Sequence, residues 1–170
     1  MKRKKLISIF VLLFSLSSIF GCKKILNVAI PYPKDEVLQD NFHANRKEFD
    51  ELIKCFREDS NILYINLQNE VVDFDRNKIS IAAPRLDEYK RLFSKLNIQQ
   101  INRNQFDQNI FLRVWAIPNY LFRGKSKYYV FTETPPKNLE NSLDDIYESG
   151  SDSNDFKKIE GNWYLYLDVW

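Results

Sequence analysis

The chain has little of the chemistry that most catalytic sites need. Its 170 residues include one histidine, His43, and two cysteines, Cys22 and Cys55. A structural zinc site takes four ligands, mostly nitrogen or sulfur, so these residues cannot complete one. Phosphate-binding loops, nucleophile elbows and zinc-protease spacings are absent as well. The composition therefore predicts no metal and no cofactor, and it favours a binding protein over an enzyme.

An excess of positive charge is also missing from most of the chain. The formal net charge is +2, but Lys2, Arg3, Lys4 and Lys5 place four positive charges at the extreme N-terminus. The remainder is slightly acidic and lacks the clustered basic face that a nucleic-acid-binding domain needs. We therefore expect no nucleic-acid partner.

The basic N-terminus is followed by an apolar run over residues 6–20. As a helix this run would span about 22 Å, which is short for a bilayer core of about 30 Å. A basic start, a short apolar stretch and a small residue before a cleavage point are typical of a secretory signal peptide. We expect residues 1–21 to be a signal peptide, and the alternative is an uncleaved N-terminal anchor helix.

The segment Ile19-Phe20-Gly21-Cys22 resembles the lipobox of bacterial lipoproteins. The resemblance implies cleavage between Gly21 and Cys22 and attachment of a diacylglycerol to the Cys22 thiol, which makes the membrane a partner. Two or more acyl chains anchor a protein stably, at about 0.8 kcal/mol per buried methylene. Because Lys23 follows in place of a retention aspartate, the resemblance implies the bacterial cell envelope, at the outer membrane facing the periplasm.

The rest of the chain has the composition of a tether and one globular domain. Residues 22–34 are predicted to be a lipid-anchored tether, because two prolines near its end favour extended chain. Residues 35–170 suit a single domain, rich in the aromatic side chains that build a core. With Cys22 acylated, Cys55 has no disulfide partner, and we interpret it as a small buried side chain rather than a reactive thiol.

Apolar periodicity predicts the class of this domain. Residues 35–59 and 84–96 each place apolar side chains on one stripe at helical spacing. Residues 138–155 are polar and acidic and are predicted to be a mobile loop. Strands joined by short turns pair antiparallel, so the fold class is α+β: a mostly antiparallel sheet with two helices on one face, after the N-terminal signal segment. The predicted strands cover residues 61–74, 79–82, 110–117, 120–122, 127–132, 156–160 and 163–170.

Carboxylates are the remaining candidates for catalysis. Asp73 and Asp75 lie two apart in strand material and would share one face. They could form the acid–base pair of a small envelope hydrolase or hold a hard cation. We favour a solvated strand end, because nothing nearby completes a site. The acidic cluster over residues 144–155 lacks the spacing of a helix–loop–helix calcium site.

Two segments near the C-terminus carry a resemblance. Residues 135–139 (PPKNL) and 158–166 (KIEGNWYLY) resemble segments of a family of small uncharacterised bacterial proteins, and residues 88–93 are similar to a helix of the same group. The resemblance implies no known activity and brings no catalytic residues. Immunity and accessory factors are found among proteins of this general kind.

Aromatic side chains on the late strands are the remaining signal for binding, because such residues are enriched at protein interfaces. The alternative is that both sheet faces are covered. We therefore predict a non-catalytic, lipid-anchored envelope protein that binds another protein, with an immunity or inhibitor factor as one role. A carboxylate hydrolase and a carrier of an apolar ligand are alternatives. The candidate interaction surface comprises Tyr128, Tyr129, Phe131, Tyr164, Tyr166 and Trp170.

Overall fold

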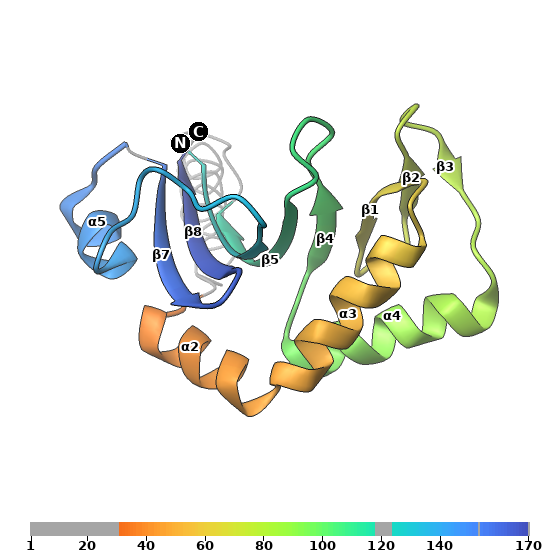
Figure 1. Ribbon diagram of the computed structural model, residues 1–170, viewed down its shortest axis with the longest axis horizontal. Helices are drawn as coiled ribbons and strands as arrows, with labels where there is room; N and C mark the ends of the chain where they lie inside the picture. The colour runs from red at the N-terminus through yellow and green to blue at the C-terminus, as the bar shows by residue number, and fades with distance from the viewer. Residues whose placement is uncertain (1–30, 118–123, 153, 170) are drawn as a thin grey trace, which may run out of the picture. The chain divides into compact units, whose positions relative to one another are not determined.

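The computed structural model describes residues 31–117, 124–152 and 154–169. The chain divides into two compact units, Met1–Pro31 and Tyr32–Trp170. The described part of the second unit holds an eight-stranded antiparallel sheet and four helices (Figure 1), which confirms the α+β class and the mostly antiparallel sheet. Within the described ranges, no helix has the length and apolar character to cross a membrane.

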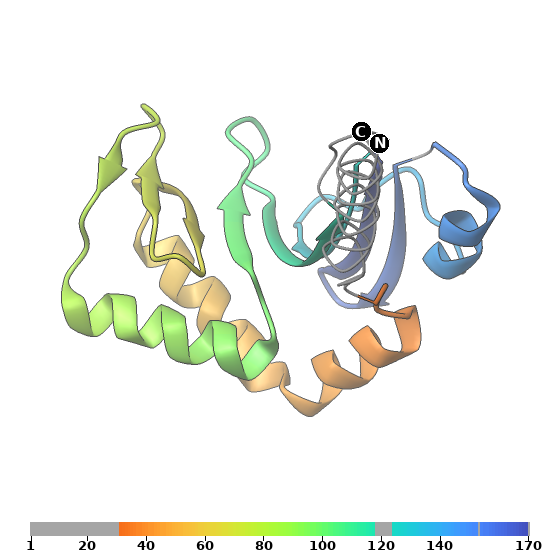
Figure 2. The ribbon, with the colours of Figure 1, turned by 180° about the vertical axis from the view of Figure 1, so that it is seen from behind.

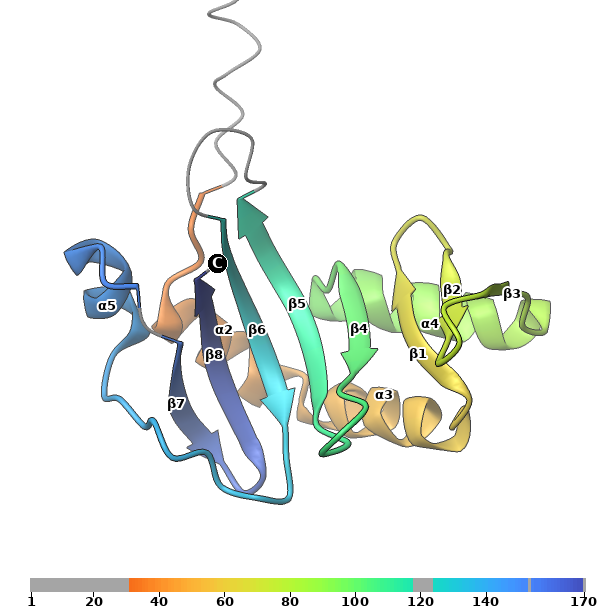
Figure 3. The ribbon, with the colours of Figure 1, turned by 90° about the horizontal axis from the view of Figure 1, so that it is seen from above.

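The described residues form two more helices than the two predicted. Their bounds are α2 (Asp35–Ala44), α3 (Arg46–Glu58), α4 (Ala83–Leu96) and α5 (Leu143–Ser149). Figure 3 shows α2, α3 and α4 behind the sheet, and α5 at its edge. Figure 2 shows α3 and α4 side by side, where Arg91 of α4 bonds to Glu51 of α3. The buried apolar side chains of all four helices belong to one core with the sheet.

Asn45 divides the helix that was predicted over residues 35–59. Its side-chain amide donates to the carbonyl and to the side-chain oxygen of Asn41, both at 2.9 Å. Such local bonds compete with the helical hydrogen-bond ladder. Figure 1 shows the chain changing direction between α2 and α3. The turn brings the fully buried rings of Phe42 and Phe49 to 5.1 Å between centroids.

Helix α5 lies inside the segment predicted as a mobile loop. The Ser142 hydroxyl caps its start by accepting from the Asp145 N–H at 3.1 Å. Gly150 ends it at φ 71°, the left-handed conformation that glycine adopts at helix ends. The prediction was wrong because seven residues with one fully buried apolar side chain, Leu143, give too little periodicity to detect.

The sheet has the strand order β3-β2-β1-β4-β5-β6-β8-β7, and every neighbouring pair is antiparallel. The strand bounds are β1 (Ile62–Asn66), β2 (Val71–Asp73), β3 (Lys78–Ile79), β4 (Gln100–Arg103), β5 (Ile110–Ile117), β6 (Lys125–Phe131), β7 (Asp155–Glu160) and β8 (Trp163–Val169).

Strand β4 was not predicted, because only one of its four residues, Ile101, is apolar. It pairs with β1 on one side and β5 on the other. Its last residue, Arg103, is buried, donates to the Phe56 carbonyl and places its guanidinium 4.9 Å from the centre of the Phe56 ring. Sheet context has overridden a weak strand propensity here.

Side chains alternate between the two faces of the sheet, and the core occupies the face that the helices cover. In β8, Trp163, Leu165, Leu167 and Val169 belong to the core, whereas Tyr164, Tyr166 and Asp168 point away. The opposite face, over which no described helix lies in Figure 3, is called the open face below.

Candidate functional site

The structure separates the predicted surface aromatics onto the two faces of the sheet. Tyr129 and Phe131 lie on the helix-facing side, opposite Leu165 and Trp163 of β8. Tyr129 is fully buried, and its hydroxyl donates to the Leu38 carbonyl at 2.7 Å. Its assignment to an interaction surface was wrong, because successive residues of a strand point to opposite faces. Phe131 is partly buried against the core.

Tyr128, Tyr164 and Tyr166 lie on the open face. Tyr164 is 2% exposed, with the Lys158 ammonium 4.1 Å from its ring centre. Tyr128 and Tyr166 are half-buried and keep exposed ring surface. Trp170, Gly21 and Cys22 lie outside the described residues, so the predictions made for them stay predictions.

Four rings form a continuous aromatic cluster across the open face. Phe111 of β5, Tyr128 of β6, Tyr166 of β8 and Phe156 of β7 are all half-buried. Ring centroids lie 6.0 Å apart for Phe111 and Tyr128, 5.8 Å for Tyr128 and Tyr166, and 4.4 Å for the stacked Phe156 and Tyr166. Because each ring comes from a different strand, the sheet register fixes the cluster in advance of any binding event.

A shallow pocket of about 290 Å³ lies on this cluster. The Tyr166 hydroxyl donates to Asp168 at 3.3 Å. Burial raises the pKa of the Asp168 carboxyl, and this hydrogen bond lowers it by a smaller amount. Among the ion pairs of residues 31–117, 124–152 and 154–169, none includes Asp168. The pocket is lined by Asn102, Asn104, Phe111, Tyr128, Tyr166 and Asp168.

A fully exposed phenylalanine follows the pocket residue Asn104 by two positions in the chain. Phe106 is 95% exposed at the tip of the β4–β5 hairpin. Its N–H donates to the side-chain oxygen of the pocket residue Asn104 at 2.9 Å, and the Asn109 N–H donates to Asp107 at 3.0 Å. These side-chain bonds fix the turn that presents the ring. The sequence analysis did not single out Phe106, although a lone aromatic residue in a polar turn was a visible signal.

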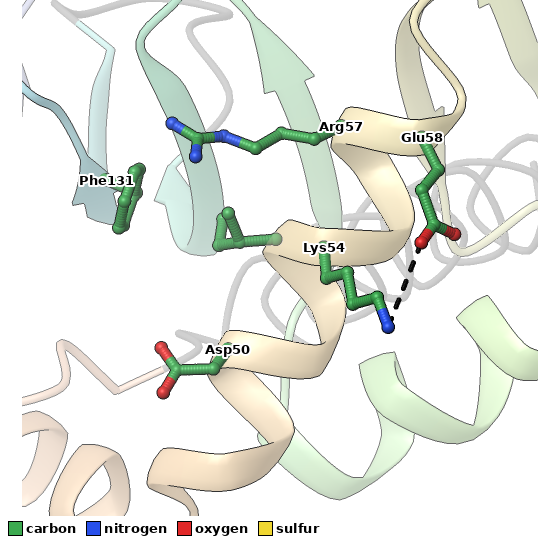
Figure 4. A pocket seen from close by; sticks show the side chains of 6 residues that line it. Asp50, Lys54, Arg57, Glu58 and Phe131 are labelled. Carbon is green, nitrogen blue, oxygen red and sulfur yellow. Dashed lines mark ion pairs between the residues drawn. The ribbon is translucent and has the colours of Figure 1, made fainter.

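A second surface pocket, of about 460 Å³, lies between α3 and the end of β6 (Figure 4). Figure 4 shows Arg57 extending toward Phe131, and its guanidinium lies 4.8 Å from that ring centre. Arg57 also pairs with Glu133 at 2.6 Å, and Lys54 with Glu58 at 4.0 Å. These charged side chains already have partners within the chain. This pocket therefore offers a ligand fewer unpaired charged groups than the open face does.

One of the two carboxylates considered for hydrolysis, Asp73, stabilises a turn. Asp73 accepts a hydrogen bond from the Asn77 N–H at 2.8 Å and so closes the β2–β3 connection. Asp75 is exposed on the same connection. Across the described ranges, no group of three or more histidine, cysteine, aspartate or glutamate side chains could hold a metal ion.

Cys55 is buried in α3 with 4% of its surface exposed, as its interpretation as a small buried side chain requires. Burial, followed by a hydrogen bond with Glu88, raises the pKa of the thiol to about 11. The thiol therefore stays protonated near neutral pH, which makes it a poor nucleophile.

The pocket between α4 and β1 bears on the carrier alternative. It encloses about 50 Å³ and is lined in part by Ile65, Leu86 and Phe93. Pockets for organic ligands measure about 300–1,000 Å³, so this space is too small for one.

A buried charge cluster lies on the helix-facing side, formed by Tyr32, Asp35, Lys127, Asp144 and Lys157. Lys127 of β6 is fully buried, and its Nζ lies 2.6 Å from Asp35 and 3.0 Å from Asp144. Asp35 also pairs with Lys157 at 3.1 Å. The cluster joins the starts of α2 and α5 to the sheet. Tyr32 stacks on Tyr147 at 3.8 Å, so the compact unit begins three residues before the predicted domain boundary.

Two groups of this cluster have shifted pKa values. Burial, with the charge of Asp144 next in size, raises the pKa of the Tyr32 hydroxyl far above its ordinary value. Burial acts to raise the pKa of Asp144 as well, but hydrogen bonds from the Asp35 backbone and from Lys127 outweigh it and lower that pKa. Asp144 is therefore held as a carboxylate.

No family model, curated protein or solved structure matches the chain. The resemblances to the lipobox of bacterial lipoproteins, and through residues 135–139 and 158–166 to small bacterial proteins, stay predictions.

Proposed function

We propose that the protein is a non-catalytic, lipid-anchored protein of the bacterial cell envelope that binds another protein through the open face of its sheet. The observation that carries the proposal is the fixed aromatic cluster on that face together with the exposed Phe106. Rigid aromatic anchors contribute most of the binding energy at many interfaces, because they bury a large area at low entropic cost.

The charge of the open face specifies the partner further. Asp168 is half-buried in the pocket without a cationic partner among the described residues, next to the rings of Tyr128 and Tyr166. A lysine or arginine side chain would pair with the carboxylate and lie against the rings, at a gain of about 0.5–2 kcal/mol for the cation–π contact. The partner surface is therefore apolar opposite Phe106 and basic opposite Asp168.

The length of the tether limits how far from the membrane this partner is bound. A lipid on Cys22 would leave ten residues before the compact unit begins at Tyr32. Ten extended residues reach at most about 35 Å, so the partner would be bound close to the membrane surface. An immunity or inhibitor factor fits this arrangement, because such a protein acts by binding and needs no catalytic group.

Site-specific photo-cross-linking in cells of the source organism tests the proposal. A photoreactive phenylalanine analogue replaces Phe106 in one variant and Val37 in the other. Val37 is the matched control, because it is 60% exposed and belongs to α2, behind the sheet. We expect one discrete adduct from position 106 and none from position 37.

Equal adducts from both positions, or an adduct from position 37 alone, would refute the open face as the binding surface. The anchor is tested separately by mass spectrometry of the native protein. We expect a lipid-modified Cys22 at the N-terminus, and an unmodified thiol there would refute the anchor without touching the binding surface.

A further inference from the structure

The Lys127 ammonium has more acceptors than it has protons. Its Nζ donates to the Tyr32 hydroxyl at 2.8 Å, the Pro33 carbonyl at 2.9 Å and Asp144 Oδ1 at 3.0 Å. These three bonds use its three N–H groups. Asp35 Oδ1 lies closer still, at 2.6 Å, yet it is buried and receives no hydrogen bond. The Lys127 nitrogen is thus in contact with the Asp35 carboxyl group, although Oδ1 of that group accepts no hydrogen bond.

The other oxygen of the same carboxyl group is strongly polarised. Asp35 Oδ2 accepts from the Leu143 N–H at 2.9 Å and from the Lys157 ammonium at 3.1 Å. Donors placed in this way stabilise the negative charge that develops on a carbonyl oxygen under nucleophilic attack. The carboxyl carbon of Asp35 is therefore prepared as an electrophile, with a nitrogen beside it.

The two groups are shielded from solvent. The Lys127 side chain is fully buried and that of Asp35 is 3% exposed. The Tyr32 ring centre lies 4.2 Å from the Lys127 Nζ, and Trp115 packs against that ring at 5.2 Å. This burial keeps bulk water away from the amine and the carboxyl group.

From this geometry we propose that Lys127 Nζ and Asp35 Cγ condense within the folded chain to an isopeptide bond, with Asp144 as the proton acceptor. Rotation of the ammonium about its Cε–Nζ bond first directs one N–H at Asp35 Oδ1, and that proton passes to the oxygen. The neutral amine then attacks Cγ, and the charge on Oδ2 is held by the Leu143 N–H and Lys157. Asp144 takes a proton from the nitrogen and passes it to Oδ1, which leaves as water. The C–N bond replaces the C–O bond, and the Asp144 carboxylate is regenerated.

Products and reactants balance without an oxidant or a further reagent. The three protons of the ammonium end as one amide proton and two protons of water. Asp144 has 19% of its side chain exposed, which gives the water a route out. Holding amine and carboxyl in contact supplies the proximity that an amide-forming reaction lacks in solution. The bond would lock the start of α2, immediately after the tether, to strand β6, which lies between β5 and β8.

Peptide mapping of the full-length protein tests this bond directly. Trypsin cuts after Lys34 and Arg46, and after Lys125 and Lys137, but not after an acylated Lys127. We expect peptides 35–46 and 126–137 to appear as one branched species, lighter than their sum by one water molecule. Fragmentation should place the link between Lys127 and Asp35.

Variants separate the roles of the residues. Lys127→Arg keeps the charge but cannot form the amide, so the branched peptide should vanish, whereas it should persist in the Lys125→Arg control on the same strand. Asp144→Asn should reduce the linked fraction at least tenfold after a fixed time. Cleavage after Lys127 in the wild-type protein would overturn the proposal, whether or not the variants fold. Full linkage in Asp144→Asn would overturn the role of Asp144.

Discussion

On the helix-facing side of β6, the Lys127 ammonium is fully buried and four oxygen atoms surround it. One residue further along the strand, Tyr128 lies half-buried on the open face, near an Asp168 carboxylate that no described cation pairs with. The side under the helices thus pairs the Lys127 ammonium within the chain, whereas the described residues of the open face provide no ion pair for Asp168. Stability depends on the first side, and recognition, in our proposal, on the second.

The largest expected effect is a loss of stability from a substitution on the helix-facing side. Lys127→Met removes both the proposed amide and the ammonium that faces the buried Asp35 and the half-buried Asp144. Losing one member of a buried charge pair alone costs about 3–5 kcal/mol of unfolding free energy. Chemical denaturation measures this loss. The control is Lys125→Met on the same strand, a half-buried lysine 4.7 Å from the Tyr147 ring centre, which should lose about 1 kcal/mol or less. Equal losses in the two variants would contradict the account.

The next effect should appear on the open face and leave the fold alone. Phe106→Ala removes a ring that is 95% exposed, so the free energy of unfolding should stay within about 0.5 kcal/mol of the wild type. Binding of the partner identified by cross-linking should weaken about tenfold or more, as for an interface anchor. Calorimetric titration measures the Kd, with Val37→Ala as the control. Unchanged affinity in Phe106→Ala would show that this ring does not belong to the interface.

Two aspartates should give opposite pH dependences, one from each side. Because the folded pKa of Asp168 is raised, its ionisation costs stability as the pH rises above the ordinary value, so Asp168→Asn should stabilise the protein at neutral pH. The folded pKa of Asp144 is lowered, so its carboxylate stabilises the fold above the ordinary value and Asp144→Asn should destabilise it there. In strong acid, the difference in unfolding free energy between each variant and the wild type should become smaller. Urea titrations at neutral and acidic pH measure them, and equal signs would contradict the comparison.

The smallest effect concerns Cys55, which belongs wholly to the helix-facing side. In a Cys22→Ser variant it is the only thiol. With its pKa raised to about 11 and 4% of its surface exposed, it should not react with iodoacetamide in the folded protein at neutral pH. Mass spectrometry should detect alkylation only after unfolding. Rapid labelling of the native protein would show that this part of the core opens.

Strong periodicity allowed much of the fold to be predicted. Leu86, Tyr89, Phe93 and Leu96 recur at helical spacing, and α4 follows the prediction to within one residue. The alternation in β8 and the turn at Gly161 likewise predicted the last hairpin. The predictions missed elements set by single polar residues, such as the break at Asn45, or by neighbouring strands, as for β4. No apolar pattern marks either of these.

The candidate site could be predicted only in part. Tyr128 and Tyr166 were singled out from the sequence, but Phe111 and Phe156 join them through the register of four strands, which one sequence does not reveal. The sequence analysis did not single out Lys127, because the partners of a lysine in a predicted strand are not visible in the sequence. Those partners lie 92 and 17 residues away, at Asp35 and Asp144, and only the fold brings them together.

Oxidative footprinting in the native envelope tests the central claim most directly, because it requires no knowledge of the partner. Phe106 and Val37 report on the open face and on the helical side, at 95% and 60% exposure in the isolated unit. We predict that oxidation of Phe106 falls several-fold in intact envelopes relative to the purified protein, while oxidation of Val37 stays the same. Equal oxidation of Phe106 in both preparations, or protection of Val37 alone, would contradict a partner bound to the open face.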